Sequence, residues 1–238
     1  MDINIINNEE RFLAGELESY TSKGLENKFD EKGNPLPFPG CTIICNIPLN
    51  THLSDQIRNF QKKIENFNPE KTYFYLPPSS FHMTLFDCCN LDTENTKYWP
   101  SNVDPNIDYK DIAVELNNRI ENYIFPENLN LKLKMFFGGY SIILEPFSEE
   151  DEKILRNCRD ELSSLLKIKF ENHQRYTFHI TLAYILRELK KDEIKKLLEF
   201  NKDLYQEFDK KFPKIVLNKP EMSTFENMLE FKSINQII

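Results

Sequence analysis

Apolar residues recur along this chain in two spacings, one typical of helices and one typical of strands. In the stretch 54–66, apolar residues recur every three or four positions, which places them on one face of a helix. Ser54 opens this stretch as the expected N-cap, and Ser148 opens another with a Ser-x-x-Asp capping box. The helical stretches are 10–21, 54–66, 108–124, 148–166 and 190–208. We therefore expect four long helices and a short one near the start of the chain.

Runs rich in apolar, β-branched and aromatic residues lie between these helices and predict strands. Gly, Pro, Asn and Asp bound the runs or break them: Pro77-Pro78 bends one, Gly138-Gly139 turns another into a hairpin, and Pro220 interrupts the last. The expected strands are 41–48, 72–86, a hairpin over 131–146, 175–186, and terminal strands within 214–236. The stretch 87–107 is rich in Asn, Asp, Thr and Pro and predicts a long loop.

Helices and strands alternate in both halves of the chain, which favours an α+β fold. We expect two similar sheet-plus-helix lobes around a central cleft, running roughly from 40 to 107 and from 108 to 238. Whether the lobes exchange strands stays open. They would form one bilobal domain over 22–238, preceded by an arm or short helix over 1–21.

Charge and composition narrow the class of ligand. The 238 residues carry a net charge of −8, with a pI of about 5.2. Binding of long duplex nucleic acid needs a basic surface, so we do not expect it here. A small phosphorylated ligand fits better. The chain starts on a polar, acidic stretch and has no apolar run of roughly 20 residues, so a cytoplasmic monomer away from membranes is expected. Five cysteines in no metal or disulfide spacing are expected to be reduced.

One short block occurs twice. Residues 80–85 read Ser-Phe-His-Met-Thr-Leu and residues 177–182 read Thr-Phe-His-Ile-Thr-Leu, with four identical positions. Side chains alternate along a strand, so the His and Thr of each block point to one face and the apolar residues to the other. Each strand would therefore bury its apolar residues and present one imidazole and one hydroxyl to a cleft.

The repeated residues suit phosphodiester chemistry. Histidine can act as an acid or a base near neutral pH, and a pair can divide these two roles. Threonine hydroxyls can donate hydrogen bonds to phosphate oxygens. The catalytic candidates are His82, Thr84, His179 and Thr181, and this scheme requires neither a metal ion nor a cofactor. A lone histidine on a strand is commonly structural, so the prediction depends on the repeat.

Further substrate-binding candidates flank the two blocks. If the strand stays regular upstream of His179, Arg175 and Thr177 share its face, and Ser80 shares that of His82 in the first block. Arg175 would then pair with phosphate, or else be a solvated residue at the end of the strand.

Tyrosines and the remaining histidines have simpler interpretations. Tyr176, Tyr184 and Tyr140 could stack on a base, although packing in the core or on the surface is the alternative. His52 and His173 are expected to be ordinary surface residues.

Two His-x-Thr motifs, about a hundred residues apart, resemble the two-histidine (2H) phosphoesterase superfamily. The stretch KFDEKGNPLPFPGCTIICNIP (28–48), with FHMTLF and YTFHITLAYIL, looks similar to a branch known as a domain of unknown function. The likeness extends from about residue 22 to the C-terminus. It implies a bilobal α+β fold, with the four motif residues lining a central groove.

Three functions remain open from the sequence. The first is a phosphodiesterase that acts on a 2′,3′-cyclic phosphate or a short oligonucleotide, with a nucleotide or an RNA end as its partner. The second is a module that binds such a ligand without turnover. The third is a metal-dependent hydrolase that uses histidines with Asp87, which follows His82 closely.

Overall fold

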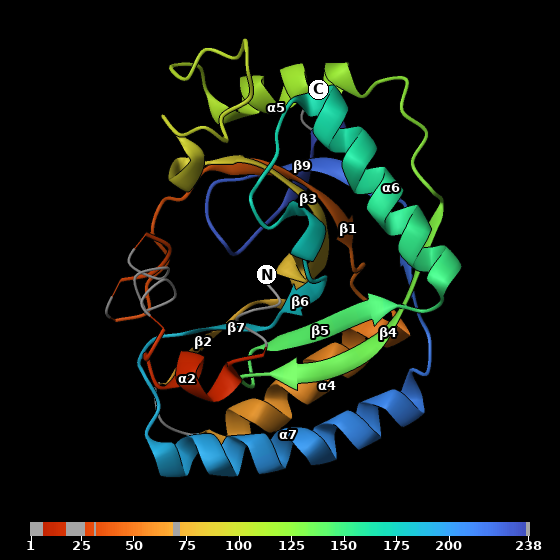
Figure 1. Cartoon of the computed structure of the whole chain (residues 1–238). Helices are drawn as coiled ribbons and strands as arrows, with labels where there is room; N and C mark the ends of the chain where they lie inside the picture. The colour runs from red at the N-terminus through yellow and green to blue at the C-terminus, as the bar shows by residue number, and fades with distance from the viewer. Residues whose placement is uncertain (1–6, 18–26, 31, 69–71, 237–238) are drawn as a thin grey trace.

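A curled antiparallel sheet forms the centre of the computed structural model, which describes residues 7–17, 27–30, 32–68 and 72–236. Its eight strands run in the order β10-β9-β1-β3-β6-β5-β4-β8 (Figure 1). Strands β2 and β7 form a separate two-stranded sheet. The strands are β1 (Gly40–Asn46), β2 (Tyr73–Tyr75), β3 (His82–Asn90), β4 (Asn128–Phe137), β5 (Ser141–Pro146), β6 (His179–Thr181), β7 (Ala183–Ile185), β8 (Ile215–Asn218), β9 (Glu221–Phe225) and β10 (Lys232–Ser233).

Helices cover this sheet from outside its curl (Figure 1). Helix α5 contacts β1 and β9, α6 contacts β3 and β5, and α7 contacts β4. Helix α4 joins them through Phe60, whose ring lies 5.8 Å from Phe136 on β4 and 5.0 Å from Phe208 on α7. The helices are α2 (Glu9–Leu13), α4 (His52–Phe67), α5 (Tyr109–Arg119), α6 (Glu149–Leu166) and α7 (Lys191–Lys211), with short 3-10 helices η1 (Pro78–Ser80), η2 (Leu91–Thr93), η3 (His173–Arg175) and η4 (Ile234–Gln236).

The α+β class expected from the sequence is confirmed. The two halves of the chain share one sheet, because β3 from the first half pairs with β6 from the second. The last strands, β9 and β10, return to the first half, where β9 pairs with β1. The two stretches 40–107 and 108–238 therefore meet within a continuous layer of strands.

Helix positions follow the sequence closely, with two corrections. Helix α6 begins after Ser148, whose side chain accepts a hydrogen bond from the Asp151 amide at 3.2 Å, as the capping box predicts. Helix α4, however, is capped by Thr51 rather than Ser54, so its cap lies three residues earlier and the helix begins at His52. The first helix ends at Leu13 because Gly15 takes a positive φ of 69°, and positions 18–21 of the expected helix lie outside the described residues.

The two strands that carry the repeated block are each broken. The break at Pro77-Pro78 was expected from the sequence, whereas the 175–186 stretch was expected to form a single strand. The 72–86 stretch divides into β2, the turn η1 and β3, and the 175–186 stretch divides into η3, β6 and β7. The buried Gln61 amide stabilises both breaks, since its Nε2 donates to the carbonyls of Leu76 (2.8 Å) and Leu182 (2.7 Å). Strand β3 also runs to Asn90, three residues beyond the first residue of the expected loop 87–107.

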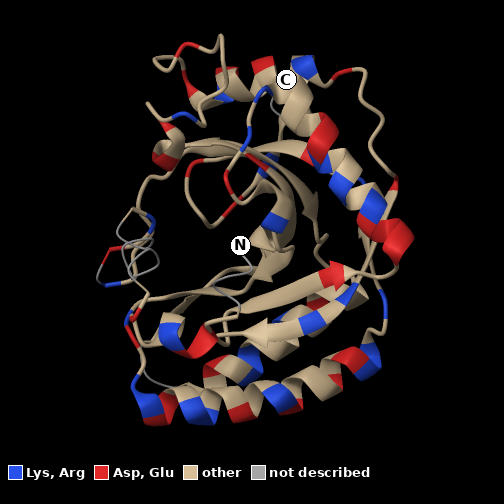
Figure 2. Cartoon of the chain, viewed as in Figure 1, with Lys and Arg blue, Asp and Glu red and all other residues tan. Residues whose placement is uncertain are grey.

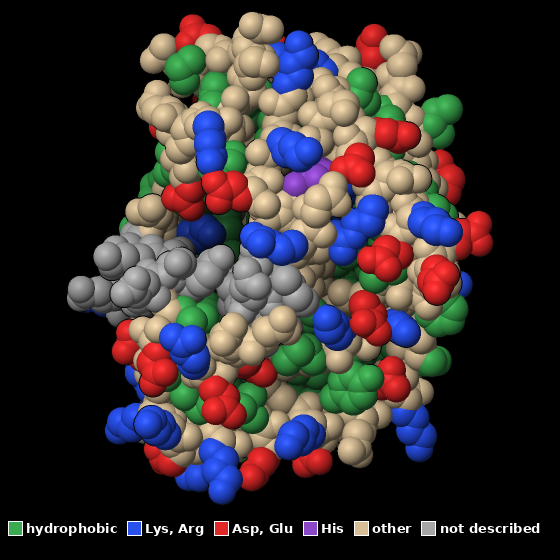
Figure 3. Space-filling view, viewed as in Figure 1, with side chains coloured by type: hydrophobic (Ala, Val, Ile, Leu, Met, Phe, Trp, Pro, Cys, Tyr) green, Lys and Arg blue, Asp and Glu red, His purple; other side chains and the backbone are tan. Residues whose placement is uncertain are grey.

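Charged side chains gather on the outer helices, while the strands are mostly uncharged (Figure 2). On the face shown in Figure 3, basic and acidic side chains alternate and no large area carries one sign. Within the described residues, no helix combines the length and the apolar character needed to cross a bilayer. All five cysteines are buried thiols.

Candidate active site

The four repeated residues lie together on one face at the middle of the sheet. Met83 of β3 is paired with Ile180 of β6, and both side chains are completely buried on the opposite face. The antiparallel register makes His82 the cross-strand neighbour of Thr181, and Thr84 the neighbour of His179. All four side chains are partly exposed. The two histidines therefore stand diagonally across a pair of neighbouring strands, on one continuous sheet.

Both imidazoles are oriented by the same contact. Nδ1 of His82 lies 2.7 Å from the carbonyl oxygen of Ser80, and Nδ1 of His179 lies 3.0 Å from that of Thr177. A carbonyl oxygen only accepts hydrogen bonds, so Nδ1 carries the proton and donates it in each case. In the neutral ring, Nε2 is then the basic nitrogen. The two motifs thus share their hydrogen-bonding pattern as well as their sequence.

Burial favours the neutral form of both histidines. It lowers the pKa of His82 to about 4, and the hydrogen bond to Ser80 and the charge of Asp87 oppose this only in part. Burial also lowers the pKa of His179 well below its usual range, and the nearby His82 and Lys28 lower it further. A phosphate anion between the rings would raise both pKa values, so substrate binding itself favours the protonated form that a general acid needs.

Strand β3 has two bulges, and the first of them, at Leu85, brings Asp87 to this face. Leu85 and Cys88 each lack a partner in the register between β1 and β3, and each extra residue shifts the alternation of side chains by one position. Asp87 is consequently partly exposed, like His82 and Thr84, while Phe86 is buried. Sequence reasoning considered Asp87 only as a metal ligand, because bulges have no reliable sequence signal.

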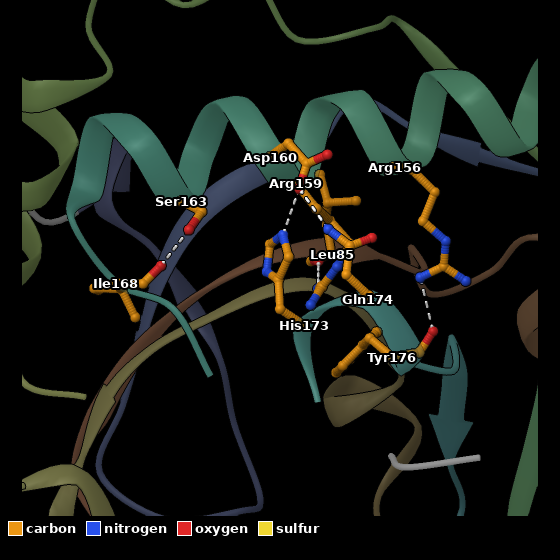
Figure 4. Close-up of polar contacts among 9 residues, drawn as sticks. All are labelled: Leu85, Arg156, Arg159, Asp160, Ser163, Ile168, His173, Gln174 and Tyr176. Atoms are coloured by element: carbon orange, nitrogen blue, oxygen red, sulfur yellow. Dashed lines mark hydrogen bonds and ion pairs between the residues drawn. The ribbon is translucent and has the colours of Figure 1, made fainter. Parts of the chain in front are cut away.

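Arg159 and Tyr176 support β3 from beneath helix α6 (Figure 4). The Arg159 guanidinium lies 4.0 Å from the centre of the Tyr176 ring and donates a hydrogen bond to the carbonyl of Leu85, the bulged residue. The side chains of Thr84 and Asp87 influence the pKa of the Tyr176 phenol, which burial raises. This buried stack therefore connects α6 to the strand that carries His82 and Thr84, and the sequence did not single out Arg159.

The expectation that Arg175, Thr177 and Ser80 share the faces of the histidines is wrong. Regular strand begins only at His179, and Arg175 belongs to the 3-10 helix η3. Ser80 lies in η1 with its side chain buried, donating to the Pro77 carbonyl at 2.8 Å. Ser80 and Thr177 instead contribute their backbone carbonyls, which orient the imidazoles.

Three more expectations can be compared with the structure. His173 is buried, 3% exposed, and its Nε2 lies 2.7 Å from Asp160 on α6 (Figure 4), so its assignment to the surface is wrong. His52 is exposed, as expected. Tyr176 and Tyr140 are buried and pack in the core, whereas Tyr184 is partly exposed, with its ring 5.0 Å from that of Phe29.

Potential metal ligands are scattered over the described residues. No three His, Cys, Asp or Glu side chains among them come together as a metal-binding group. Asp87 influences the pKa of His82, but the pair lacks a third such ligand.

Comparisons with known proteins support the resemblance seen in the sequence. Residues 28–139 match the model of the 2H phosphodiesterase family, described as a domain of unknown function (DUF1868). A conserved protein of unknown function from Agrobacterium tumefaciens strain C58 has a similar structure, with a TM-score of 0.88 and 19% identity over 95% of this chain and 97% of that one. Escherichia coli LigT complexed with phosphate aligns at a TM-score of only 0.34 and 8% identity, over 79% of this chain and 87% of LigT. No curated protein matches the sequence.

Proposed function

We propose that this chain, which matches the 2H phosphodiesterase family over residues 28–139, hydrolyses a phosphodiester by paired-histidine catalysis without a metal ion. One observation carries the proposal: β3 and β6 place two identically oriented histidines and two threonines on the same face of the sheet. A structural histidine has no need of a matching partner on the neighbouring strand. The match to the family agrees with this reaction class.

The spacing of the two histidines suits a single phosphate. Diagonal positions on paired antiparallel strands are separated by about 7–8 Å, which leaves room for a phosphate between the two imidazoles. One Nε2 accepts a proton from the attacking water as the new P–O bond forms. The other imidazole, protonated, donates its proton to the ester oxygen whose bond to phosphorus breaks. The hydroxyls of Thr84 and Thr181 donate hydrogen bonds to the non-bridging oxygens, where negative charge accumulates.

A nucleotide or an RNA end is the substrate class we propose. A 2′,3′-cyclic phosphate fits this scheme well, since it needs only an activated water and a protonated leaving oxygen. A short oligonucleotide would present the same reacting group. The acidic chain and the mixed charges of its surface favour such small substrates over long duplexes.

The test is a screen of 2′,3′-cyclic nucleotides and of 2′–5′ and 3′–5′ linked dinucleotides in the presence of EDTA. We expect turnover of at least one of them, with a bell-shaped pH profile, because one histidine must be neutral and the other protonated. Activity lost in EDTA and restored by a divalent ion would favour the metal-dependent hydrolase. A bound cyclic nucleotide that stays intact in a single-turnover assay would favour the binding module.

A further inference from the structure

The charges next to the two histidines differ, although the motifs match. Asp87 acts on His82, where its negative charge favours the protonated ring. Lys28 acts on His179, where its positive charge favours the neutral ring. Burial lowers the pKa of both histidines, and beyond that common effect Asp87 and Lys28 act in opposite directions, a difference that has no counterpart in the repeated sequence.

Lys28 is held in place by its neighbours in the chain. Its carbonyl oxygen accepts a hydrogen bond from the Leu36 amide at 2.9 Å. The next side chain, Phe29, is buried, with its ring 4.5 Å from Phe74 and 5.0 Å from Tyr184. These contacts fix the backbone from which the lysine side chain extends.

The Lys28 ammonium lies between two aromatic rings. Nζ is 5.0 Å from the centre of Phe38 and 5.8 Å from that of Tyr184. Rings at this distance stabilise a cation without using its hydrogen-bond donors. The three N–H groups of the ammonium thus remain suited to oxygen atoms of an anion.

Nearby carboxylates act on Lys28 only at longer range. Burial lowers the pKa of Lys28, and the charges of Asp92 and Asp87 oppose this, although neither forms an ion pair with it within the described chain. Asp92 instead accepts a hydrogen bond from Asn27 at 3.2 Å. In a protein with a net charge of −8, a cation beside the histidines offsets the repulsion that an anionic substrate would otherwise meet.

We propose that Lys28 binds the phosphate of the substrate and that its position makes His179 the general base and His82, beside Asp87, the general acid. This rests on the proposed function and adds to it a third substrate-binding side chain and the direction of proton transfer. Charged groups on the elements packed around the motif strands include Arg159 of α6, which stacks on Tyr176, and Glu221 of β9, which accepts hydrogen bonds from Asn46 (2.7 Å) and Ser233 (2.5 Å). Both are already engaged in contacts within the protein.

Binding of inorganic phosphate tests the first part without any turnover. We expect Lys28→Met to weaken phosphate binding, measured by calorimetry, by roughly 10- to 100-fold, the usual effect of removing a charged hydrogen-bond donor. Lys28→Arg should retain most of the affinity because it keeps the charge. Lys32→Met is the matched control, since Lys32 is exposed in the same segment, and it should bind like the wild type. Wild-type phosphate affinity in folded Lys28→Met would overturn the proposal.

Titration of the histidine ring protons by NMR tests the second part, and only four histidines need assignment. Lys28→Met should raise the midpoint of His179 and leave His82 little changed, whereas Asp87→Asn should lower the midpoint of His82. An unchanged His179 midpoint in Lys28→Met would refute the assignment of roles. Both readouts are independent of catalysis: if they hold while no diester is hydrolysed, the proposed function fails and the Lys28 site stands. If Lys28→Met hydrolyses the diester with the wild-type kcat/KM, the proposed function stands and the role of Lys28 in substrate binding fails.

Discussion

At the scale of single residues, the site depends on which atom of each side chain is already engaged. The Nδ1 atoms of His82 and His179 are bound to backbone carbonyls, which leaves Nε2 for the proton transfers. The hydroxyls of Thr84 and Thr181 have the simpler task of donating one hydrogen bond each. Their removal should therefore cost less activity than removal of a histidine.

Thr84→Val and Thr181→Val test this role, because valine keeps the shape of the side chain and removes the hydroxyl. Each should lower kcat by roughly 10- to 100-fold, the effect of one hydrogen bond to a charged oxygen. The measurement is steady-state kinetics on whichever diester the screen identifies. Thr224→Val, on the distant strand β9, should keep the wild-type kcat, and a Thr84→Val enzyme that did the same would exclude the hydroxyl from the site.

The repeated block alone selected the four residues of the proposed site, because side chains alternate along a strand and His and Thr two positions apart share a face. Asp87, Lys28 and Arg159 could not be assigned in this way. Asp87 shares the face of His82 only through the bulge at Leu85, and a regular strand would have placed Phe86 there instead. Lys28 and Arg159 come from segments distant in sequence, so only tertiary structure shows their position.

At the scale of elements, the sequence predicted where helices lie better than where strands end. Helical spacing and the Ser148 cap are local signals, and they were sufficient for α6. Pro77-Pro78 marked the break between β2 and β3 in the sequence. The break between β6 and β7 has no such local signal, because there the Leu182 carbonyl accepts a hydrogen bond from Gln61, a residue of another element. Both breaks end the motif strands beside the candidate residues.

The contact between helix α2 and the turn between β4 and β5 is expected to depend on pH. Oε1 of Glu9 accepts a hydrogen bond from the Gly138 amide at 2.5 Å, in the turn between β4 and β5. Burial raises the pKa of Glu9 to about 7, well above its usual 4.5. The folded state therefore binds the proton more tightly, and the stabilisation is complete below pH 4.5 and is lost as the pH rises through 7.

Hydrogen exchange of the Gly138 amide measures this effect. Relative to Glu9→Gln, which keeps the acceptor oxygen and cannot ionise, the wild-type amide should lose protection between pH 5 and 8. The difference should correspond to on the order of 1–2 kcal/mol, because the carboxyl group is partly exposed and solvent screens its charge. Parallel pH dependence in both proteins would show that Glu9 ionisation does not govern the docking of α2.

At the scale of the whole molecule, the two His-x-Thr motifs occupy the junction of the two halves of the chain. The β3–β6 pair joins four strands on one side to four on the other, and β9 returns from the end of the chain to pair with β1. The sequence predicted two similar lobes around the motifs, but it could not show that both motifs belong to adjacent strands of a single sheet. Because strands from both halves share this sheet, we expect the chain to unfold as one unit.

If the chain unfolds as one unit, its thermal midpoint shows whether each histidine variant is folded. The two imidazoles are partly exposed, while the apolar core lies on the opposite face of their strands, so their removal should leave the thermal midpoint nearly unchanged. His52 is exposed and distant in sequence from both motifs, and His52→Ala should behave like the wild type in stability and turnover.

The most direct measurement of the central claim is turnover by His82→Ala, His179→Ala and the double variant, each corrected for its folded fraction by thermal unfolding. Each single variant should lose roughly 10²–10⁴-fold in kcat, the contribution of a positioned acid or base. The double variant should lose much less than the product of the two, because the histidines act as a unit. A folded His82→Ala or His179→Ala protein with wild-type turnover would show that the histidines are structural, and would contradict paired-histidine catalysis at this site.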